Sequence, residues 1–449
     1  MNYWKITLLF LFLGVLLFFV LFFIFVCFVA FYFRITSRFW FSQPVFHIYD
    51  IHYYFFNKGI INKQLPTLEN SKFIDFKNVS VEIIDWGQYM KKEKIKDIPS
   101  IINEFVLLIQ EHYFISKENK NNKFYPMKEH IIPYMTGHNA KCFLSCYKNE
   151  LNEIIGVMTS RPIHIQITNV KSRKILNKFD AYYVDFLCVK KIHRKAGVAE
   201  KLIQTHEYFQ RHTNKDIAVS VFKREEEITG IVPICIYKTF GFNMKNWRVS
   251  KNTQNQNNQN FLTINGEVYN TILTNKENIN VLYSFLKEHQ DALMCHFEVF
   301  IQTSFANLIT LINSENIYIY YVLDNKLCES KKVSCVFFFR KTRTFINKNQ
   351  EQQFLSFFAS IKTPNLCNEN FILLFKNCLS SLVFKTFTSS PQKEIVKFTH
   401  LLIEDISDNG IILKNILLKT PPILVSPTAF FFYNFAWNTF SSSSVFALY

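Results

Sequence analysis

The sequence predicts an α+β fold with a mixed, mainly antiparallel sheet, preceded by one N-terminal transmembrane helix. Two patterns support this fold class: a charge-free apolar run at the start, and after it a mixture of alternating strand-like runs and helical runs with apolar spacings of three and four. Hydrophobic residues make up 49% of the 449 residues, with 10 Gly and 12 Pro, which favours a compact protein. The length suits two or three domains, or one large double domain.

The apolar run covers residues 6–33. As a helix, these 28 residues would span about 42 Å, more than the ~30 Å hydrocarbon core of a bilayer. The run ends in AFYFRITSRFW, not in the small residues of a cleavage site, which predicts a retained anchor and not a signal peptide. Lys5 lies on one side and Arg34 and Arg38 on the other, so charge does not fix the orientation.

The first part of the remaining chain alternates between strand and helix patterns. A strand pattern comes first, a helix opened by Pro99 and Ser100 follows, and three β-like runs come next. These five elements cover residues 78–86, 98–114, 140–148, 152–167 and 179–189. A basic turn then leads into an amphipathic helix at 190–212, followed by a strand at 216–225 and a short helix at 233–242 that closes on Gly241.

The polar stretch NTQNQNNQN, residues 252–260, reads as a loop or linker that divides the soluble chain almost in half. Beyond it the sequence again mixes helices and strands. We expect helices at 280–290 and 351–361, and strands at 316–323, 334–341, 410–418 and 428–440.

The chain is basic, with a formal net charge of +16 and a pI near 9.2. Such a charge suits an anionic partner, such as a phosphorylated cofactor or an anionic leaflet, and equally a solvated basic surface without a dedicated partner. No run of five Lys or Arg occurs, so a nucleic-acid partner is not predicted.

The ten cysteines are scattered and form no CxxC pair with a matching partner. We therefore expect no metal site and no disulfide framework, and instead reduced, buried thiols in a cytosolic domain. A single-pass membrane protein with its larger domain facing the cytosol is the resulting prediction.

The informative unit is VDFLCVKKIHRKAGVAEKLI, residues 184–203. A strand ends at Val189, and a helix starts directly after the turn. Successive backbone N–H groups and the positive end of a helix then point at one place, which suits a pyrophosphate. Gly197 permits close backbone approach, and two basic side chains add charge. The residues of this candidate phosphate turn are Arg194, Lys195, Ala196, Gly197, Val198 and Ala199.

This turn resembles the R/Q-x-x-G-x-G/A turn of acyltransferases with the GNAT fold, and IYKTFGF at 236–242 fits their following strand and short helix. A closer resemblance is to protein N-myristoyltransferases. RFWFSQPV at 38–45 is similar to their F-W-x-x-Q-P-V segment, and residues 184–199 to their N-F-L-C-V-H-K-K-L-R signature. Further similar segments follow in the same order: LLIQEHYF at 107–114, RPIHIQI at 161–167, CIYK at 235–238 and FFFYNFAW at 430–437.

The resemblance implies two fused GNAT-like halves that follow the anchor at 6–33 in the chain. Residues 38–250 would bind acyl-CoA, and residues 251–449 would form most of the peptide groove and the C-terminal strand. Myristoyl-CoA would be a co-substrate, with no permanently bound cofactor. Besides the phosphate turn, the implied donor-binding residues are Arg38, Phe39, Trp40, Gln43, Cys188 and Val189. An interfacial aromatic belt is the alternative role for Phe39 and Trp40.

The implied reaction is direct attack on the thioester by the N-terminal glycine amine of a protein. The backbone amides of Phe186 and Leu187, at a strand bulge, would hold the oxyanion, while their side chains pack in the core. The terminal carboxylate of Tyr449 would take the amine proton, if the last 12 residues thread back into the core and are not a disordered tail. Tyr113, Phe114 and Tyr237 would contact the acceptor peptide.

The sequence departs from the family pattern at Asp185, Gly197 and Glu200, and the turn is closer to that of ordinary GNAT enzymes. Two alternatives therefore stay open: an N-acetyltransferase acting on a small amine or lysine, and a non-catalytic membrane-bound protein that binds acyl-CoA or peptide. A covalent intermediate on Cys188 is not expected.

Overall fold

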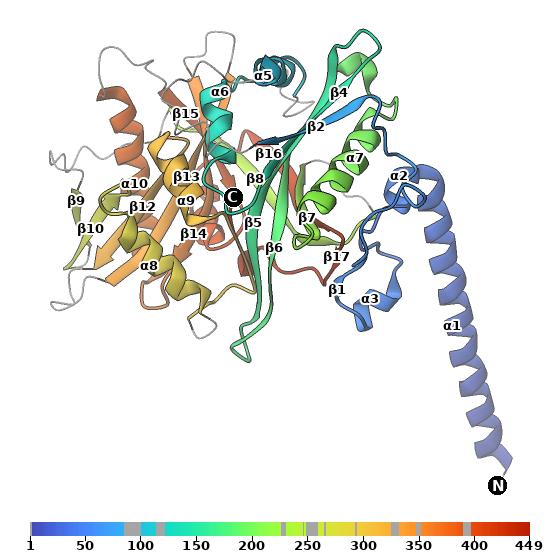
Figure 1. Ribbon diagram of the computed structural model, residues 1–449. Helices are drawn as coiled ribbons and strands as arrows, with labels where there is room; N and C mark the ends of the chain where they lie inside the picture. Colours follow the sequence, from blue (N-terminus) through green and yellow to red (C-terminus); the bar gives the residue numbers. More distant parts are fainter. Residues whose placement is uncertain are drawn as a thin grey trace.

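The computed structural model describes residues 2–84, 100–113, 122–225, 230–245, 247, 259–264, 266–291, 294–324, 332–346, 352–388 and 397–449. The predicted α+β class is confirmed, because helices flank one large, mainly antiparallel sheet (Figure 1).

Helix α1 (Asn2–Thr36) projects from one side of the body, next to the short helices α2 (Arg38–Phe41) and α3 (Ile51–Phe55) (Figure 1). Of the helices in the described ranges, it is the one long and apolar enough to span a membrane. Length and composition fit a membrane anchor and an N-terminal signal sequence alike.

In the described residues the sheet has 16 strands, and its main path runs in the order β18-β11-β5-β6-β7-β16-β8-β15-β14-β13-β12-β10-β9. Neighbours pair mostly antiparallel, and β6–β7 is among the parallel pairs. In the first part of the chain the strands are β2 (Val79–Ile84), β3 (Asn122–Phe124), β4 (Cys142–Lys148), β5 (Ile154–Asn169), β6 (Lys174–Val189), β7 (Val219–Glu225) and β8 (Pro233–Asn243).

In the second part the strands are β9 (Gln259–Ile264), β10 (Glu267–Leu273), β11 (Val299–Gln302), β12 (Ile317–Asp324), β13 (Lys332–Ile346), β14 (Gln352–Lys362), β15 (Lys397–Glu404), β16 (Leu424–Tyr433) and β18 (Val445–Leu448). Strand β16 lies between β7 and β8, and β11 pairs with β5. Strands from beyond residue 250 thus complete the sheet of the first part. The predicted division of the chain into two halves at residue 250 stays a prediction.

Helices cover both faces of the sheet. In β6, Cys188 joins the core cluster of α5 (Ser100–His112) and the next residue, Val189, joins that of α7 (Val198–Thr213). Because successive strand residues point to opposite faces, the two helices lie on opposite sides. The second part repeats this arrangement with α8 (Ile279–Gln290) and α9 (Phe305–Asn313) on one face and α10 (Asn368–Thr388) and α11 (Asn409–Leu417) on the other.

Three predicted elements have the wrong type. Residues 233–242 form strand β8 and residues 352–361 belong to strand β14, although helices were expected at 233–242 and 351–361; residue 351 lies outside the described residues. Residues 353–361 are buried throughout, and such a strand reads as one apolar run without alternation. Residues 410–418 lie mostly in α11, not in a strand, since Ile412, Leu413 and Ile416 are buried at helical spacing. Of the predicted linker, 252–258 lie outside the described residues, and 259–260 belong to β9.

The N-terminal segment that follows α2 is held by residues near the other end of the chain. Strand β1 (Gly59–Ile60) pairs with β17 (Phe435–Ala436). The buried Asn434 side chain accepts the Asn62 N–H at 2.7 Å and donates to the Asn62 carbonyl at 2.9 Å. The Asn434 N–H donates to the Pro44 carbonyl. This contact fixes the segment that carries the Phe-Trp motif against the sheet.

Candidate active site

The site lies where β6 and β7 separate. These parallel strands pair from Ala181↔Val219 to Val184↔Phe222, although β6 continues to Val189 and β7 to Glu225. A cavity of about 1620 Å³ is lined by residues from both diverging strands, from the start of α7, from the end of α1 and from α2. Such a split presents unpaired backbone to a ligand at the centre of the sheet.

A bulge in β6 carries the two residues predicted to form the oxyanion site. Val157 pairs with Cys188 and Thr159 with Asp185, so Phe186 and Leu187 together oppose Met158. Phe186 has a left-handed backbone, with φ of 52°, and its ring packs edge-on against Phe105. The Leu187 side chain is 38% exposed and lines the cavity, so its predicted packing in the core is wrong.

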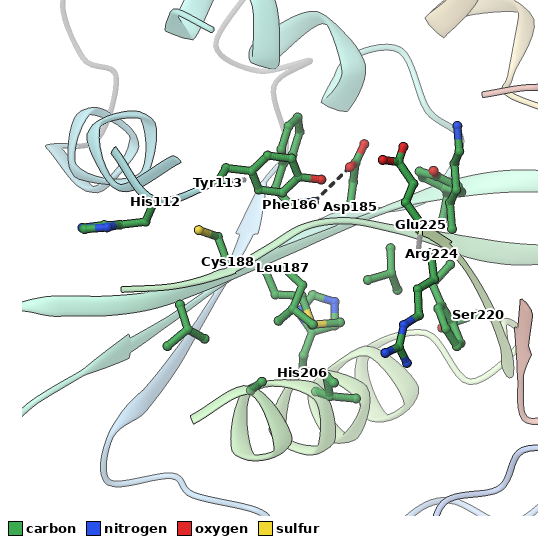
Figure 2. Close-up of a pocket in the computed structure, with 18 of the residues that line it drawn as sticks. His112, Tyr113, Asp185, Phe186, Leu187, Cys188, His206, Ser220, Arg224 and Glu225 are labelled. Carbon is green, nitrogen blue, oxygen red and sulfur yellow. Dashed lines mark hydrogen bonds between the residues drawn. The ribbon is translucent and has the colours of Figure 1, made fainter. Parts of the chain in front are cut away.

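The amide of Phe186 already has an acceptor in this structure. It donates to Asp185 Oδ1 at 2.9 Å, and Figure 2 shows this bond beside the bulge. To serve as the predicted oxyanion donor, the Phe186 amide must therefore release the Asp185 carboxylate and donate its hydrogen bond to the developing oxyanion instead.

Helix α7 begins at the cavity with the predicted turn. Gly197, at its N-cap, has φ of 78°, a conformation that favours glycine, and Lys195 has φ of 65°. The first N–H groups of a helix have no intrahelical acceptor and carry its positive dipole end, so they attract an anion. Arg194, Lys195, Val198 and Ala199 line the cavity, whereas Ala196 and Gly197 are not among its lining residues.

Arg194 has a positioning role as well as a charge. Its Nε donates to the Val189 carbonyl at 3.1 Å, and its Nη2 donates to the His112 carbonyl at 2.7 Å. The side chain therefore joins the end of β6 to the end of α5 and fixes the loop before α7.

The start of α7 packs directly on the sheet at Gly156. A Cβ at this position would lie 2.8 Å from Leu202 Cδ1 and 2.9 Å from Val198 Cγ1. We expect Gly156→Val to push the first turn of α7 off the sheet, to lower the free energy of unfolding by about 1 to 3 kcal/mol and to weaken acyl-CoA binding. Urea denaturation and titration with acyl-CoA measure the two effects. Unchanged stability would show that α7 is not seated here.

The Phe-Trp segment forms another wall. The Trp40 ring stacks on Phe222 with centroids 5.5 Å apart, and Arg38, Phe39 and Trp40 line the cavity. Gln43 does not belong to the described lining residues. It is buried, and its Oε1 accepts a hydrogen bond from the Tyr433 hydroxyl at 2.7 Å. We therefore assign Gln43 a role in positioning this segment.

Two carboxylates and a tyrosine hydroxyl gather on the side of the β6 bulge opposite α7 (Figure 2). Figure 2 shows the Tyr113 hydroxyl and the carboxylates of Asp185 and Glu225 directed toward one part of the cavity. Burial raises the pKa of Tyr113, and the charges of Asp185 and Glu225 raise it further. Arg161 lies 3.2 Å from Asp185, is 2% exposed, and stacks over the Tyr134 and Tyr183 rings.

The end of the chain reaches the same region. Strand β18 pairs with β11, and Tyr449 is 3% exposed, which confirms that the last residues thread into the core. The Tyr449 main-chain oxygen accepts a hydrogen bond from the half-buried Arg340. The Lys223 Nζ lies 3.0 Å from Glu404 and 3.3 Å from the Tyr449 hydroxyl, so cations surround this end.

No protein-family model and no curated protein sequence matches the chain. Among solved structures it is similar to N-myristoyltransferase of Saccharomyces cerevisiae. Two structures with bound myristoyl-CoA give 13% identity, with TM-scores of 0.62 and 0.63, over 91% of this chain and 94% and 89% of theirs. A third, with myristoyl-CoA and inhibitors, gives 13% identity and a TM-score of 0.63 over 93% and 95%.

The chain has the N-myristoyltransferase fold. The resemblance read from the sequence is thus confirmed for the fold. At 13% identity the likeness does not extend to substrates or residue roles.

The three residues that were predicted to contact the peptide at this N-myristoyltransferase-like site differ in where they lie. Tyr237 is buried and is not one of the described lining residues; its hydroxyl donates at 2.6 Å to Oε2 of Glu404, which does line the cavity. Tyr113 lines the cavity, whereas Phe114 lies outside the described residues. The sequence analysis missed Arg161 and Arg340. Arg161 is a lone arginine within the buried strand β5, a pattern that signals a charge facing a partner or cavity, whereas Arg340 lies in a basic stretch of β13 that also contains Lys341 and Arg343 and so gives no such signal.

His206 of α7 is buried below the bulge (Figure 2) and bridges Ser145 and Ser160, with ring nitrogen to oxygen distances of 2.7 and 2.8 Å. Burial lowers its pKa from 6.5 to about 3. The folded state favours the neutral ring, because the pKa of His206 is lower in the folded than in the unfolded chain. The stability that neutral His206 contributes is therefore complete above pH 6.5 and is lost as the pH falls from 6.5 toward 3.

We expect unfolding to take up one proton at His206 in this window, which lowers the free energy of unfolding by about 1.4 kcal/mol per pH unit. His206→Asn cannot take up that proton, so its stability should fall less steeply between pH 6 and pH 4. Urea denaturation of both proteins across this range makes the comparison, and equal slopes would contradict the assignment.

Proposed function

We propose that the protein is a membrane-anchored N-acyltransferase that transfers a myristoyl or similar long-chain acyl group from acyl-CoA to the N-terminal glycine amine of proteins. One observation carries the proposal: the split between β6 and β7 joins a bulged strand, a helix N-terminus and the chain's last residue in one cavity. The matching N-myristoyltransferase structures were obtained with bound myristoyl-CoA, which supports the same donor class.

In this proposal the donor's phosphates lie at the start of α7, near Lys191, Arg194 and Lys195, and its nucleotide lies along Arg38, Phe39 and Trp40. Cys188 and Val189 line the strand beside the pantetheine arm. Burial raises the pKa of the Cys188 thiol to about 12, so a thiolate nucleophile is disfavoured there. We therefore infer direct transfer.

The acceptor approaches from the acidic side, where Asp185 and Glu225 favour a cationic ammonium group. A carboxylate, which we assign to the end of the chain at Tyr449, takes one proton from this group. The amine nitrogen then attacks the thioester carbonyl. The amides of Phe186 and Leu187 bind the oxyanion, the C–S bond breaks, and the CoA thiolate leaves and takes the second proton, which the nitrogen loses as the amide forms.

The anchor and its orientation belong to the same proposal. We infer a single-pass protein whose larger domain faces the cytosol. Free thiols at Cys146, Cys235 and Cys335, all buried, suit a reducing compartment. The 74% exposed Phe55, at the end of α3, and its neighbour Phe56 are aromatic side chains of the kind found at bilayer surfaces.

The test incubates the full chain in detergent with myristoyl-CoA and peptides that begin with Gly or Ala, and detects the added acyl group by mass spectrometry. Transfer to Gly peptides alone is expected. An acetyl-CoA preference in a competition assay would instead favour an acetyltransferase. Acyl-CoA binding without transfer to any amine would favour the non-catalytic alternative and contradict the proposal.

A further inference from the structure

The apolar helix is joined to the cavity without a flexible linker. Only Ser37 separates the end of α1 at Thr36 from the start of α2 at Arg38. The Ser37 N–H donates to the Phe33 carbonyl, and the Phe41 N–H donates to the Ser37 carbonyl, both at 2.9 Å. Backbone hydrogen bonding thus continues across the junction, so the direction of α1 is tied to that of α2.

The last turn of α1 is also docked on the body through side chains. A Cβ on Gly230 would lie 2.4 Å from the Phe33 ring, so the ring rests directly on this glycine. The Phe33 ring also lies 6.1 Å from that of Tyr49, and the Arg34 guanidinium lies 5.9 Å from the Phe41 ring. These contacts hold the last turn of α1 in one place beside the domain.

This docked turn belongs to the wall of the cavity. The lining residues from α1 are Tyr32, Phe33, Ile35 and Thr36. They adjoin Arg38 and Trp40 in the chain, on the side where the proposed donor carries its nucleotide and phosphates. Because the apolar run ends at Phe33, a bilayer that contains α1 brings its headgroup region to this wall.

We propose that α1 is a component of the acyl-CoA site and not only a tether, which places donor binding at the bilayer surface. This inference rests on the proposed function, and adds that the acyl-CoA contacts the last turn of the membrane helix. A long-chain acyl-CoA is itself an amphiphile that partitions into bilayers, so the donor and the site would meet at the same interface.

Ile35 gives a test that does not depend on core packing, because it is 65% exposed. The full chain is placed in phosphatidylcholine nanodiscs, and binding of a non-hydrolysable thioether analogue of myristoyl-CoA is titrated. We expect Ile35→Glu to weaken binding about tenfold through repulsion of the anionic donor, and Ile35→Lys to bind at least as tightly as the wild type. The difference should shrink as ionic strength rises.

The matched control places the same two charges at Phe31, which is exposed one helical turn earlier and is not one of the described lining residues. Phe31→Glu and Phe31→Lys are expected to differ by less than threefold. Equal affinities of the two Ile35 variants, with normal wild-type binding, would overturn the inference alone. Absence of binding by the wild type would overturn the proposed function as well.

Discussion

Extension of the chain by a few residues beyond Tyr449 is expected to lower the rate of glycine-peptide acylation by on the order of 10³. The terminal carboxylate would become an amide without basicity, and the added residues would enter the cavity that Tyr449 lines. Turnover with saturating myristoyl-CoA measures the loss. A C-terminus that tolerates extension would assign the proton acceptor to another group.

A binding measurement separates this catalytic effect from misfolding. The proposed donor-binding residues lie on α1 and α2, at the end of β6 and in the turn that leads into α7, and none of them belongs to β18. The extended chain should therefore keep its acyl-CoA affinity within about twofold. Loss of both binding and turnover would indicate that the added residues displace β18 from β11, and the catalytic role would then not follow.

Asp185→Asn is expected to lower the free energy of unfolding by about 3 kcal/mol, because it leaves the buried Arg161 without its counter-ion. Arg161→Leu combined with Asp185→Asn should regain most of this loss, since no uncompensated charge remains. Urea denaturation gives the three values. A single-variant loss below about 1 kcal/mol would mean that the Tyr134 and Tyr183 rings suffice to stabilise the guanidinium.

A matched surface substitution controls for the change from carboxylate to amide. Glu315 lies 3.3 Å from Lys341 and its side chain is 53% exposed, so solvent screens this pair. We expect Glu315→Gln to change the free energy of unfolding by less than about 0.5 kcal/mol.

The part of the site that the sequence predicts well is local. The turn from Arg194 to Ala199 follows a strand and precedes a helix within a few residues, so one segment carries the whole pattern. The bulge at Phe186 and Leu187 and the aromatic wall of Phe39 and Trp40 are equally short signals, and the structure brings them to one cavity.

The acidic side of the cavity could not be predicted in this way. Asp185, Glu225, Arg340 and Tyr449 come from β6, β7, β13 and the end of the chain, and only the order of strands in the sheet brings them together. Sequence similarity also could not distinguish a residue that lines the cavity from a buried residue that holds a lining residue in place. Tyr237 lies in a matching segment, yet it is not among the described lining residues, and its hydroxyl donates a hydrogen bond to the lining residue Glu404.

The hydrogen bonds between Asn62 and Asn434 join residues 372 positions apart. At a synthesis rate of about 5 to 20 residues per second, the first of these residues would leave the ribosome on the order of 20 to 70 s before the second. In this interval α1 would already be available for membrane insertion, while the Phe-Trp segment lacks the strands against which it packs. Folding is thus expected to be late and slow, as for other proteins with many distant contacts, and the nascent domain would depend on protection from aggregation at the membrane surface.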